Sequence, residues 1–318
     1  MKTIRSALNE TLFDCMQQDE TIIIMGEDIA GGDDPAGDAT LGGCFGVTAG
    51  LYAQFGPKRM MNMPISETAF MGTAVGAAMT GLKPVVEIMF CDFMGVCFDQ
   101  IINQAAKTRF LTGNKRPIPL VIRTTFGAGD GSAAMHSQSL YGMLMQVAGL
   151  NVAVPSTPSE AEAVLKAALG GTDPTVIFEH KDLYDQGDND WLAQGGDVTV
   201  VAVGKVAHSA RRAQEMLETH DILIDVINPV WLSPLDMDPV LDSLANTGRL
   251  IVVDEGAHQA GFADAVVAEV SRRGFDLLKA APITIAPQPT PVPYARALEE
   301  KWLPAEDDII EAVKGLLA

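Results

Sequence analysis

Short apolar runs alternate along the chain with segments in which apolar residues recur every three or four positions. The segment 3–16 has an apolar residue at every fourth position from Ile4, and Thr3 can cap the helix that this spacing predicts. An unbroken apolar run at 21–25 predicts a buried strand. Short apolar strands that alternate with helices indicate parallel βαβ units with helices on both faces of a sheet. Further strands are predicted at 59–63, 85–89, 118–123, 151–154 and 175–179, and helices over 93–110 and from Pro158.

A second series of the same kind follows a polar stretch. Residues 182–196 are polar and weakly patterned, and we interpret them as a linker. The expected fold class is therefore α/β with two domains, 1–181 and 197–318, each built on a sheet flanked by helices. In the second domain the pattern predicts strands at 197–203, 222–227, 249–253 and 282–286, and a closing amphipathic helix at 307–317.

Composition agrees with a globular protein of two domains. At 318 residues, with 47% apolar and 20% charged residues, the chain is long enough for two hydrophobic cores. The net charge of −19 argues against nucleic acid or an anionic membrane as a partner and permits a basic protein partner. The four cysteines lack zinc-site spacing, the N-terminus lacks a secretory signal, and no apolar run is long enough to span a bilayer. A cytoplasmic location is expected.

The segment that starts at Pro64 combines features of structure and of chemistry. A strand is predicted to end at Pro64, Ser66 can cap the helix that follows, and Glu67 lies in the first turn of that helix. A carboxylate at a helix N-terminus is stabilised by the helix dipole, so Glu67 has a purely structural explanation. Gly72 and Gly76 lie on one face of the same helix and predict close packing against a neighbouring backbone.

Polar and aromatic side chains are expected at the ends of three successive strands. Ligands of parallel α/β sheets bind at the carboxyl ends of the strands. Glu67 follows one strand, Met89 and Phe93 follow the next, and His136 follows a third. Taken singly, Met89 and Phe93 suit the core and His136 suits a structural histidine. Together they predict a cleft that contains a carboxylate, an apolar wall and an imidazole.

Two glycine-rich loops are expected, at 31–46 and at 124–138. The first is either functional, as long glycine-rich loops often are, or a disordered insertion. The second contains Gly129-Asp130-Gly131, which begins the magnesium-diphosphate motif of thiamine enzymes, but the Asn-Asn pair that completes this motif about thirty residues later is missing. We therefore interpret these glycines as turn residues and expect the chain to lack a phosphate-binding site of its own.

Several motifs together resemble one family over nearly the whole chain. The chain is similar to the beta subunit of the thiamine-diphosphate-dependent first component of 2-oxo acid dehydrogenase complexes. Within this group, EIMFCDFMGVCFDQ and IFEHKDLYD are most similar to acetoin dehydrogenase beta subunits, and the pyruvate and branched-chain enzymes are close relatives. The motifs that carry the resemblance are GED at 26–28, PISE at 64–67, GxAVGAAMTGLKPVVE at 72–87, DQIINQAAK at 99–107, HSQS at 136–139, and SPLD with TGRLIVVDEG near the end.

The resemblance implies an architecture and a set of partners. It implies an N-terminal transketolase-type pyrimidine-binding domain and a C-terminal transketolase-type domain. It also implies an α2β2 heterotetramer whose alpha subunit holds the diphosphate and Mg2+ of thiamine diphosphate, and a lipoyl acyltransferase as a further partner. The cofactor would then lie between an alpha and a beta subunit.

The same resemblance implies roles for individual residues. Glu67 would be buried and would hydrogen-bond a ring nitrogen of the aminopyrimidine, which favours the tautomer that activates the thiazolium carbon. Ile65, Met89 and Phe93 would bind the pyrimidine ring. His136 would face the substrate and assist proton transfer or reductive acylation of a lipoyl arm. Some relatives also bind K+ through backbone carbonyls, and the matching positions are Leu120, Ala168, Leu169, Gly171 and Asp173.

Two departures from the family pattern are visible. Met135 stands where the family has Gln, and 228–232 replace an Asp-Leu-Arg-Thr-Leu segment, so that its Arg is absent. The second departure affects the contacts expected of the C-terminal domain, including subunit docking. It leaves Glu67 and His136 untouched.

The expected function is that of the beta subunit of a thiamine-dependent oxidoreductase component that cleaves acetoin and transfers a two-carbon unit to a lipoyl acyltransferase. One alternative is the beta subunit of a decarboxylating pyruvate or branched-chain 2-oxo acid dehydrogenase. Another, of a different class, is a non-catalytic assembly subunit that docks the acyltransferase. A split transketolase that acts on sugar phosphates is disfavoured, because the sequence shows no basic phosphate pocket.

Overall fold

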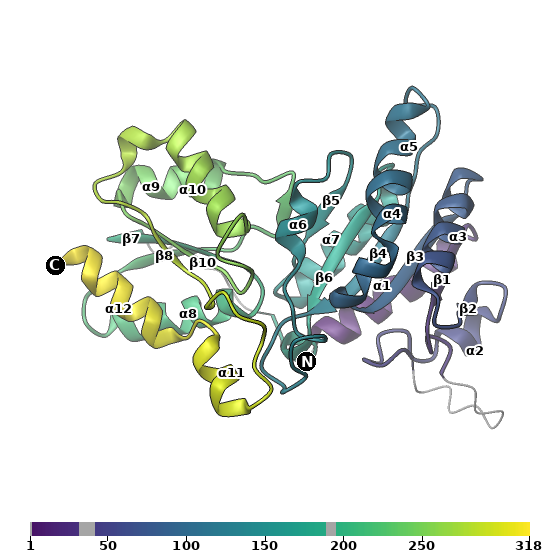
Figure 1. Cartoon of the computed structure of the whole chain (residues 1–318), viewed down its shortest axis with the longest axis horizontal. Coiled ribbons are helices and arrows are strands. Elements are labelled where there is room, and N and C mark those ends of the chain that lie inside the picture. The colour runs from purple at the N-terminus through teal and green to yellow at the C-terminus, as the bar shows by residue number, and fades with distance from the viewer. Residues whose placement is uncertain (1, 32–41, 189–194) are drawn as a thin grey trace.

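Seven strands, six of them from the N-terminal half of the chain, form one sheet among the residues that the structure describes. The computed structural model describes residues 2–31, 42–188 and 195–318 (Figure 1). The strand order is β2-β1-β3-β4-β6-β5-β9, and every pair except the last is parallel. The strands are β1 (Ile22–Gly26), β2 (Met60–Asn62), β3 (Lys83–Phe90), β4 (Val121–Phe126), β5 (Asn151–Ala153), β6 (Thr175–His180) and β9 (Trp231–Ser233).

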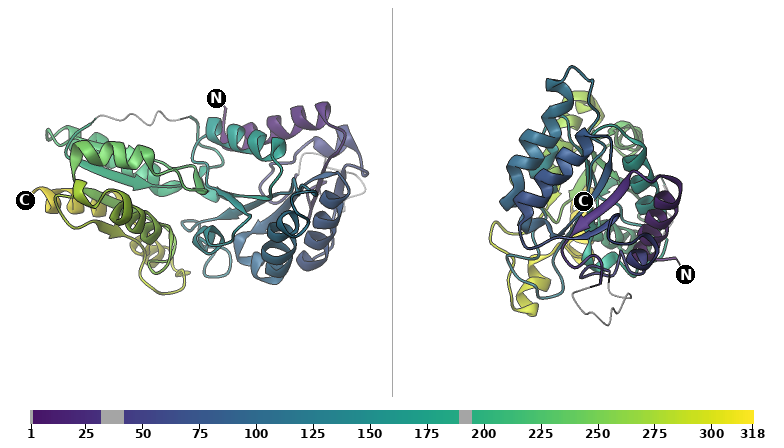
Figure 2. Two further views of the ribbon diagram at one scale, coloured as in Figure 1. Left: turned by 90° about the horizontal axis from the view of Figure 1, so that it is seen from above. Right: turned by 90° about the vertical axis from the view of Figure 1, so that its right-hand side faces the viewer.

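Helices cover both faces of this sheet, as the pattern predicts. On one face α1 (Ile4–Gln18) and α7 (Pro158–Gly170) lie side by side (Figure 2). Before each of them a threonine, Thr3 or Thr157, accepts a hydrogen bond from a backbone N–H of the first turn. The opposite face carries α3 (Glu67–Met79), α4 (Met94–Asp99) and α5 (Ala106–Leu111), and two short helices, α2 (Leu51–Phe55) and α6 (Tyr141–Met145), complete this half.

The helix predicted over 93–110 is interrupted in the structure. It is divided into a 3₁₀ turn at Cys91–Phe93, α4, a π-helical segment at Gln100–Ala105, and α5. The backbone at Cys97 is not helical. Interruptions of this kind leave no mark in a hydrophobic pattern, and π-helical segments are frequent at functional sites.

The strand predicted at 118–123 starts later than expected. Strand β4 begins at Val121. The residues before it include Pro117 and Pro119, which have no N–H to donate to a neighbouring strand. The apolar run therefore extends beyond the hydrogen-bonded strand.

The close backbone packing predicted for Gly72 and Gly76 is wrong within the described residues. A Cβ placed on Gly72 would meet the side chain of Gln100 at 3.0 Å, and a Cβ on Gly76 would meet nothing within 4 Å. The first glycine thus makes room for a side chain of the π-helical segment. The second lies on an open face of α3.

Four parallel strands form a second sheet in the C-terminal half, again within the described residues. Their order is β11-β10-β7-β8, with α8 (Lys205–Glu218) and α12 (Glu306–Leu317) on one face and α9 (Asp238–Thr247) and α10 (Phe262–Arg273) on the other. A further helix, α11 (Arg296–Trp302), precedes α12. The strands are β7 (Val198–Ala202), β8 (Ile224–Ile227), β10 (Leu250–Val253) and β11 (Ile283–Ile285).

Strand β9 corrects the expectation of a purely parallel sheet. It comes from the C-terminal half of the sequence but pairs antiparallel with β5 at the edge of the first sheet, with Trp231 opposite Ala153. The segment 228–232, which departs from the family pattern, therefore joins the two halves. Asn228 contributes as well, because its side-chain amide donates to both carboxylate oxygens of Glu160 at 3.0 and 3.1 Å.

The two halves share a hydrophobic core and meet at the carboxyl ends of their strands. One cluster of buried side chains runs from α3 and α4 through the first sheet to α9 and α10. The carboxyl ends of β4 and β6 face that of β10, since Ala128 and His180 both hydrogen-bond Glu255. This arrangement brings residues of the second half to the functional edge of the first sheet.

Parts of two expected segments lie outside the described residues: 32–41 of the loop at 31–46, and 189–194 of the linker at 182–196. The domain boundaries at 181 and 197 remain predictions. In the described part of the chain no helix is long and apolar enough to cross a membrane. The four cysteines are free, and Cys91 and Cys97 are buried.

Candidate functional site

The predicted site lies along the carboxyl edge of the first sheet. Glu27 follows β1, the helix with Glu67 follows β2, the 3₁₀ turn with Phe93 follows β3, and the loop with His136 follows β4. Lys181 directly follows β6. Five neighbouring parallel strands therefore present a carboxylate pair, an aromatic wall, an imidazole and an ammonium group at one edge.

Glu67 is the first residue of α3, as predicted, but it is half-buried rather than buried. Ser66 stands at the N-cap without making the capping bond, because its hydroxyl donates to the carbonyl of Pro64 at 3.0 Å. No hydrogen-bond donor among the described residues contacts the Glu67 carboxylate. Ile65, beside it, is 85% exposed. The carboxylate thus stays available at an open face of the chain.

Glu27 lies close enough to Glu67 for the two carboxylates to affect each other. Burial raises the pKa of Glu27, and the negative charges of Glu67 and Asp28 raise it further. Its Oε1 atom is buried and has no hydrogen-bond partner. A buried acceptor without a donor is unfavourable, so this place suits a ligand that brings donor groups. An aminopyrimidine, which carries an amino group beside ring nitrogens, fits the pair.

Met89 occupies an irregular position in β3. Ile88 pairs with Thr124 and Phe90 pairs with Thr125, so Met89 is the extra residue of a β-bulge. The hydroxyl of Thr125 donates to the Met89 carbonyl. A bulge redirects the side chains that follow it, and here Phe90 as well as Met89 is half-buried at the carboxyl edge.

His136 is held between two aromatic rings. The ring of Phe90 lies edge-on at 4.7 Å between centroids, and that of Phe93 lies edge-on at 5.4 Å. The structure thus brings together His136 and Phe93, as predicted, and adds Phe90. The neighbouring Gln138 is held in turn, because its side-chain amide donates to Asp92 at 2.8 Å.

Lys181 fixes the backbone of the histidine loop. Its ammonium group donates to the carbonyl of His136 at 2.8 Å and to the carboxylate of Asp130 at 3.1 Å, and it lies 5.5 Å from the centre of the Phe90 ring. The Lys181 side chain is almost fully buried. A buried ammonium group is costly unless it is paired, so Lys181 keeps the His136 carbonyl and the Asp130 carboxylate close to it.

Sequence reasoning missed Phe90, Lys181 and Glu27 as members of the site. Phe90 directly follows Met89, the residue expected to contact the cofactor. The bulge at Met89 accounts for the position of Phe90 against His136. The signal that could have found Lys181 and Glu27 is their position: each stands two residues after the end of a predicted strand of the same sheet.

The five positions matched to a potassium site lie where α7 ends and where the neighbouring strands β4 and β6 begin. Three of these carbonyls already accept hydrogen bonds, that of Leu120 from the Thr175 N–H at 2.9 Å, that of Ala168 from the Gly171 N–H at 3.2 Å and that of Asp173 from the Thr175 hydroxyl at 3.4 Å. A carbonyl oxygen has two lone pairs, so this does not prevent cation binding. No cluster of three or more metal-binding side chains occurs among the described residues. The positions are Leu120, Ala168, Leu169, Gly171 and Asp173.

Comparisons with known proteins agree with this arrangement. The family model of the transketolase pyrimidine-binding domain matches residues 1–186 of the sequence, and the family model of the transketolase C-terminal domain matches residues 187–309. A solved structure described as a split gene transketolase, inactive beta4 tetramer, has a TM-score of 0.77 over 99% of this chain and 98% of that chain. At 23% identity it shows the fold alone.

Similarity in sequence is stronger to three bacterial proteins. The chain is 42% identical to the beta subunit of acetoin:2,6-dichlorophenolindophenol oxidoreductase from Bacillus subtilis, over 99% of this chain and 97% of that protein. It is 41% identical to the protein of the same description from Cupriavidus necator, over 98% and 96%. It is 35% identical to the beta subunit of the pyruvate dehydrogenase E1 component from Staphylococcus epidermidis, over 99% and 98%. The chain therefore belongs to the family of beta subunits of thiamine-diphosphate-dependent acetoin and 2-oxo acid dehydrogenases.

Proposed function

We propose that this chain is the beta subunit of a thiamine-diphosphate-dependent enzyme that cleaves acetoin and passes a two-carbon unit to a lipoyl acyltransferase. Identity is 42% and 41% to the two acetoin oxidoreductase subunits and 35% to the pyruvate dehydrogenase subunit, each over nearly the full chain. The ranking favours acetoin over pyruvate, and branched-chain 2-oxo acids are the other alternative.

The pair of Glu27 and Glu67 is the observation that carries the catalytic proposal. Glu67 has no donor among the described residues, and Glu27 has a buried oxygen without a partner. Glu67 would hold a proton between its carboxylate and a ring nitrogen of the aminopyrimidine, while Ile65, Met89 and Phe93 would bind the ring. When bound, thiamine diphosphate supplies a carbon nucleophile and an electron sink.

His136 would act on the substrate side of the same edge. Its imidazole would give or take a proton at the reacting oxygen of the substrate, or at the lipoyl sulfur during transfer. The edge-on rings of Phe90 and Phe93 restrict its orientation and exclude water from two of its sides. A fixed orientation matters because proton transfer requires hydrogen-bond distance and alignment.

An alpha subunit would complete the site. Ile65 is 85% exposed next to Glu67, and Met135 is 72% exposed next to His136. Large apolar side chains exposed beside both functional residues are typical of a surface that a partner covers. We propose the α2β2 heterotetramer, with the diphosphate and Mg2+ held by the alpha subunit, and docking to a lipoyl acyltransferase core. A cytoplasmic location remains a prediction.

Reconstitution tests this function. The chain is mixed with its alpha subunit, thiamine diphosphate and Mg2+, and reduction of a dye acceptor is followed with acetoin, pyruvate or a branched-chain 2-oxo acid. We expect turnover of acetoin, and only when both subunits are present. If the alpha subunit alone is fully active, the chain is an assembly subunit; if a 2-oxo acid is preferred, the substrate assignment is wrong.

We also propose K+ at the backbone positions named above, because four of the five lie in the last turn of α7 or directly after it. A rise in the thermal midpoint of the complex with K+ but not with Na+ supports this site. Equal midpoints in the two salts exclude it.

A further inference from the structure

We propose that Glu299, in the C-terminal domain, is a positioning residue for His136. It would act by holding the loop between β4 and α6, residues 127–140, in the conformation that presents the imidazole. This inference rests on the role proposed above for His136. It adds a contribution of the C-terminal domain to catalysis.

The Glu299 carboxylate binds two backbone N–H groups of this loop. Its Oε1 accepts from Gly129 at 2.9 Å and its Oε2 accepts from Gly131 at 3.0 Å. Both glycines have left-handed backbone conformations, with φ of 128° and 78°. N–H groups that lie close together in such turns can converge on one anion, and here the anion is a side chain of the same protein. The glycines thus serve the turn, as expected from the missing Asn-Asn pair.

Burial makes this attachment strong. Glu299 is 0% exposed, and no Lys, Arg or His of the described residues lies within ion-pair distance of it. A buried carboxylate is costly unless it is hydrogen-bonded, and bonds from N–H groups to a charged acceptor are stronger than neutral ones. Moving the loop away from Glu299 would leave a buried charge without donors, so the loop is kept close to one position.

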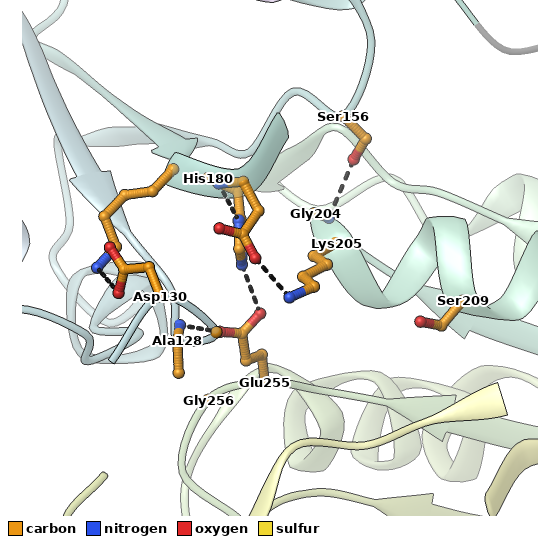
Figure 3. A network of polar contacts seen from close by, with 12 residues as sticks. Ala128, Asp130, Ser156, His180, Gly204, Lys205, Ser209, Glu255 and Gly256 are labelled. Atoms are coloured by element: carbon orange, nitrogen blue, oxygen red, sulfur yellow. Dashed lines mark hydrogen bonds and ion pairs between the residues drawn. The ribbon is translucent and has the colours of Figure 1, made fainter. Parts of the chain in front are cut away.

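A second carboxylate holds the same loop one residue earlier. Glu255 accepts from the Ala128 N–H at 2.7 Å and from the His180 ring at 2.9 Å (Figure 3). The other ring nitrogen of His180 accepts from the Asp182 N–H, so the nitrogen that faces Glu255 carries the proton. The far end of the loop is anchored to the C-terminal domain too, because the hydroxyl of Tyr141 donates to Asp254.

Short contacts connect the Glu299 attachment to His136. Asp130 lies between the two glycines that Glu299 binds, and its carboxylate accepts from Lys181 at 3.1 Å. The same ammonium group donates to the carbonyl of His136 at 2.8 Å. Glu299 is therefore connected to the backbone of His136 through the turn that contains Asp130 and through the buried Lys181. The rings of Phe90 and Phe93 then fix the orientation of the His136 imidazole.

The test compares Glu299→Ala and Glu299→Gln with Glu300→Gln in the reconstituted complex. Glu300 is the exposed neighbour of Glu299 on the same helix. We expect Glu299→Ala to lower kcat about tenfold to a hundredfold, because small displacements of a catalytic group cost that much. Glu299→Gln, which keeps one acceptor oxygen, should lose less. KM for the substrate should change less than about threefold, because ground-state binding is not altered.

Hydrogen exchange supplies a readout that does not depend on activity. In both Glu299 variants deuterium uptake should rise across 127–140 and stay unchanged across 67–79, where Glu67 lies. Glu300→Gln should match the parent protein in kcat and in uptake. The proposal is overturned if kcat per assembled tetramer is normal in Glu299→Ala, if uptake of the loop is unchanged, or if KM rises while kcat holds.

If neither Glu299 variant assembles, Glu255→Gln provides the same test from the other carboxylate. Glutamine has one acceptor oxygen where glutamate has two. Its NH2 group would therefore face a donor, such as the protonated nitrogen of His180, so one bond is lost while the volume is kept. Faster loop exchange with a lower kcat supports the proposal, and parent-like values of both contradict it. A complex that cleaves pyruvate and not acetoin would overturn the substrate assignment alone, since these measurements can be made with either substrate.

Discussion

The ring of Phe90 lies edge-on to the imidazole of His136, with centroids 4.7 Å apart and planes inclined by 84°. Phe90 comes from the strand before the one that leads into the histidine loop, directly after the bulge at Met89. The contact therefore joins two neighbouring strand ends across the sheet edge. Phe93 lies against the imidazole as well, at 5.4 Å.

Phe90→Leu should lower kcat about tenfold, because the imidazole loses the surface that orients it and proton transfer depends on its alignment. Leucine keeps an apolar side chain at this place, so the strand and the core should persist. We expect KM to stay near that of the parent enzyme. Steady-state kinetics of the reconstituted complex provide the measurement.

A structural effect of Phe90→Leu can be separated from a positional one by NMR of the chain with 13C-labelled histidine. The sequence has five histidines, so the ring signals can be resolved. Loss of the ring-current shift should be confined to His136. Phe275→Leu, which changes an exposed ring in the second domain, should alter neither the His136 signal nor kcat. An unchanged kcat in Phe90→Leu would contradict the role given to this contact.

Glu67→Gln should nearly abolish turnover while the tetramer still forms. The amide cannot hold a proton for the ring nitrogen, and general acid–base groups commonly contribute about a hundredfold to ten-thousandfold. Gel filtration checks assembly and dye reduction checks turnover. Glu20→Gln, an exposed change near the amino end of β1 and therefore away from the carboxyl edge of the sheet, is the control and should be neutral. Turnover close to that of the parent would refute the assignment of Glu67.

Much of the fold follows from periodicity, but the site depends on details that periodicity does not contain. The strands that precede Glu67 and His136 were predictable because apolar runs of strand length are bounded by glycine or proline. The bulge at Met89 was not, since an extra residue changes pairing without changing the apolar pattern. Strand β9 was missed for a related reason: a three-residue strand carries too little pattern to reveal its partner.

The partner of the loop at Gly129 was unpredictable in a different way. Gly129-Asp130-Gly131 indicates a turn with exposed N–H groups, and the sequence excludes a diphosphate motif. It does not say that the acceptor is Glu299, about 170 positions away in another domain, because such a contact arises only from tertiary packing. The half-buried state of Glu67 is likewise a result of tertiary packing, because the burial expected for it depends on a second subunit that the resemblance implies.

Acid stability should depend on Asp19, at the end of α1. The hydroxyl of Thr21 and then the ammonium group of Lys83 lower the pKa of Asp19 from its ordinary 3.8 to about 2. Since the pKa is lower in the folded state, this group stabilises the fold fully above pH 3.8, and the contribution is lost as the pH falls toward about 2. In Asp19→Asn the free energy of unfolding should fall less steeply over this pH range. Denaturant titrations at several pH values measure the slope, with the exposed Asp14→Asn as a control that should keep the parent slope.

A buried arginine in the first sheet predicts a large effect on stability. Arg123 on β4 donates to Glu87 on β3 at 2.8 Å and to Glu179 on β6 at 2.8 and 2.6 Å, and all three side chains are buried. Arg123→Met would leave two carboxylates without their cation and should destabilise the chain by about 3–5 kcal/mol, because breaking one side of a buried ion pair leaves charge uncompensated. Burial raises the pKa of Glu87, so Glu87→Gln replaces a group that is costly to ionise and keeps a hydrogen-bonding amide; it should cost no more than about 1.5 kcal/mol. Denaturant midpoints of the two variants give the comparison, and equal losses would show that Arg123 is not the group that compensates both carboxylates.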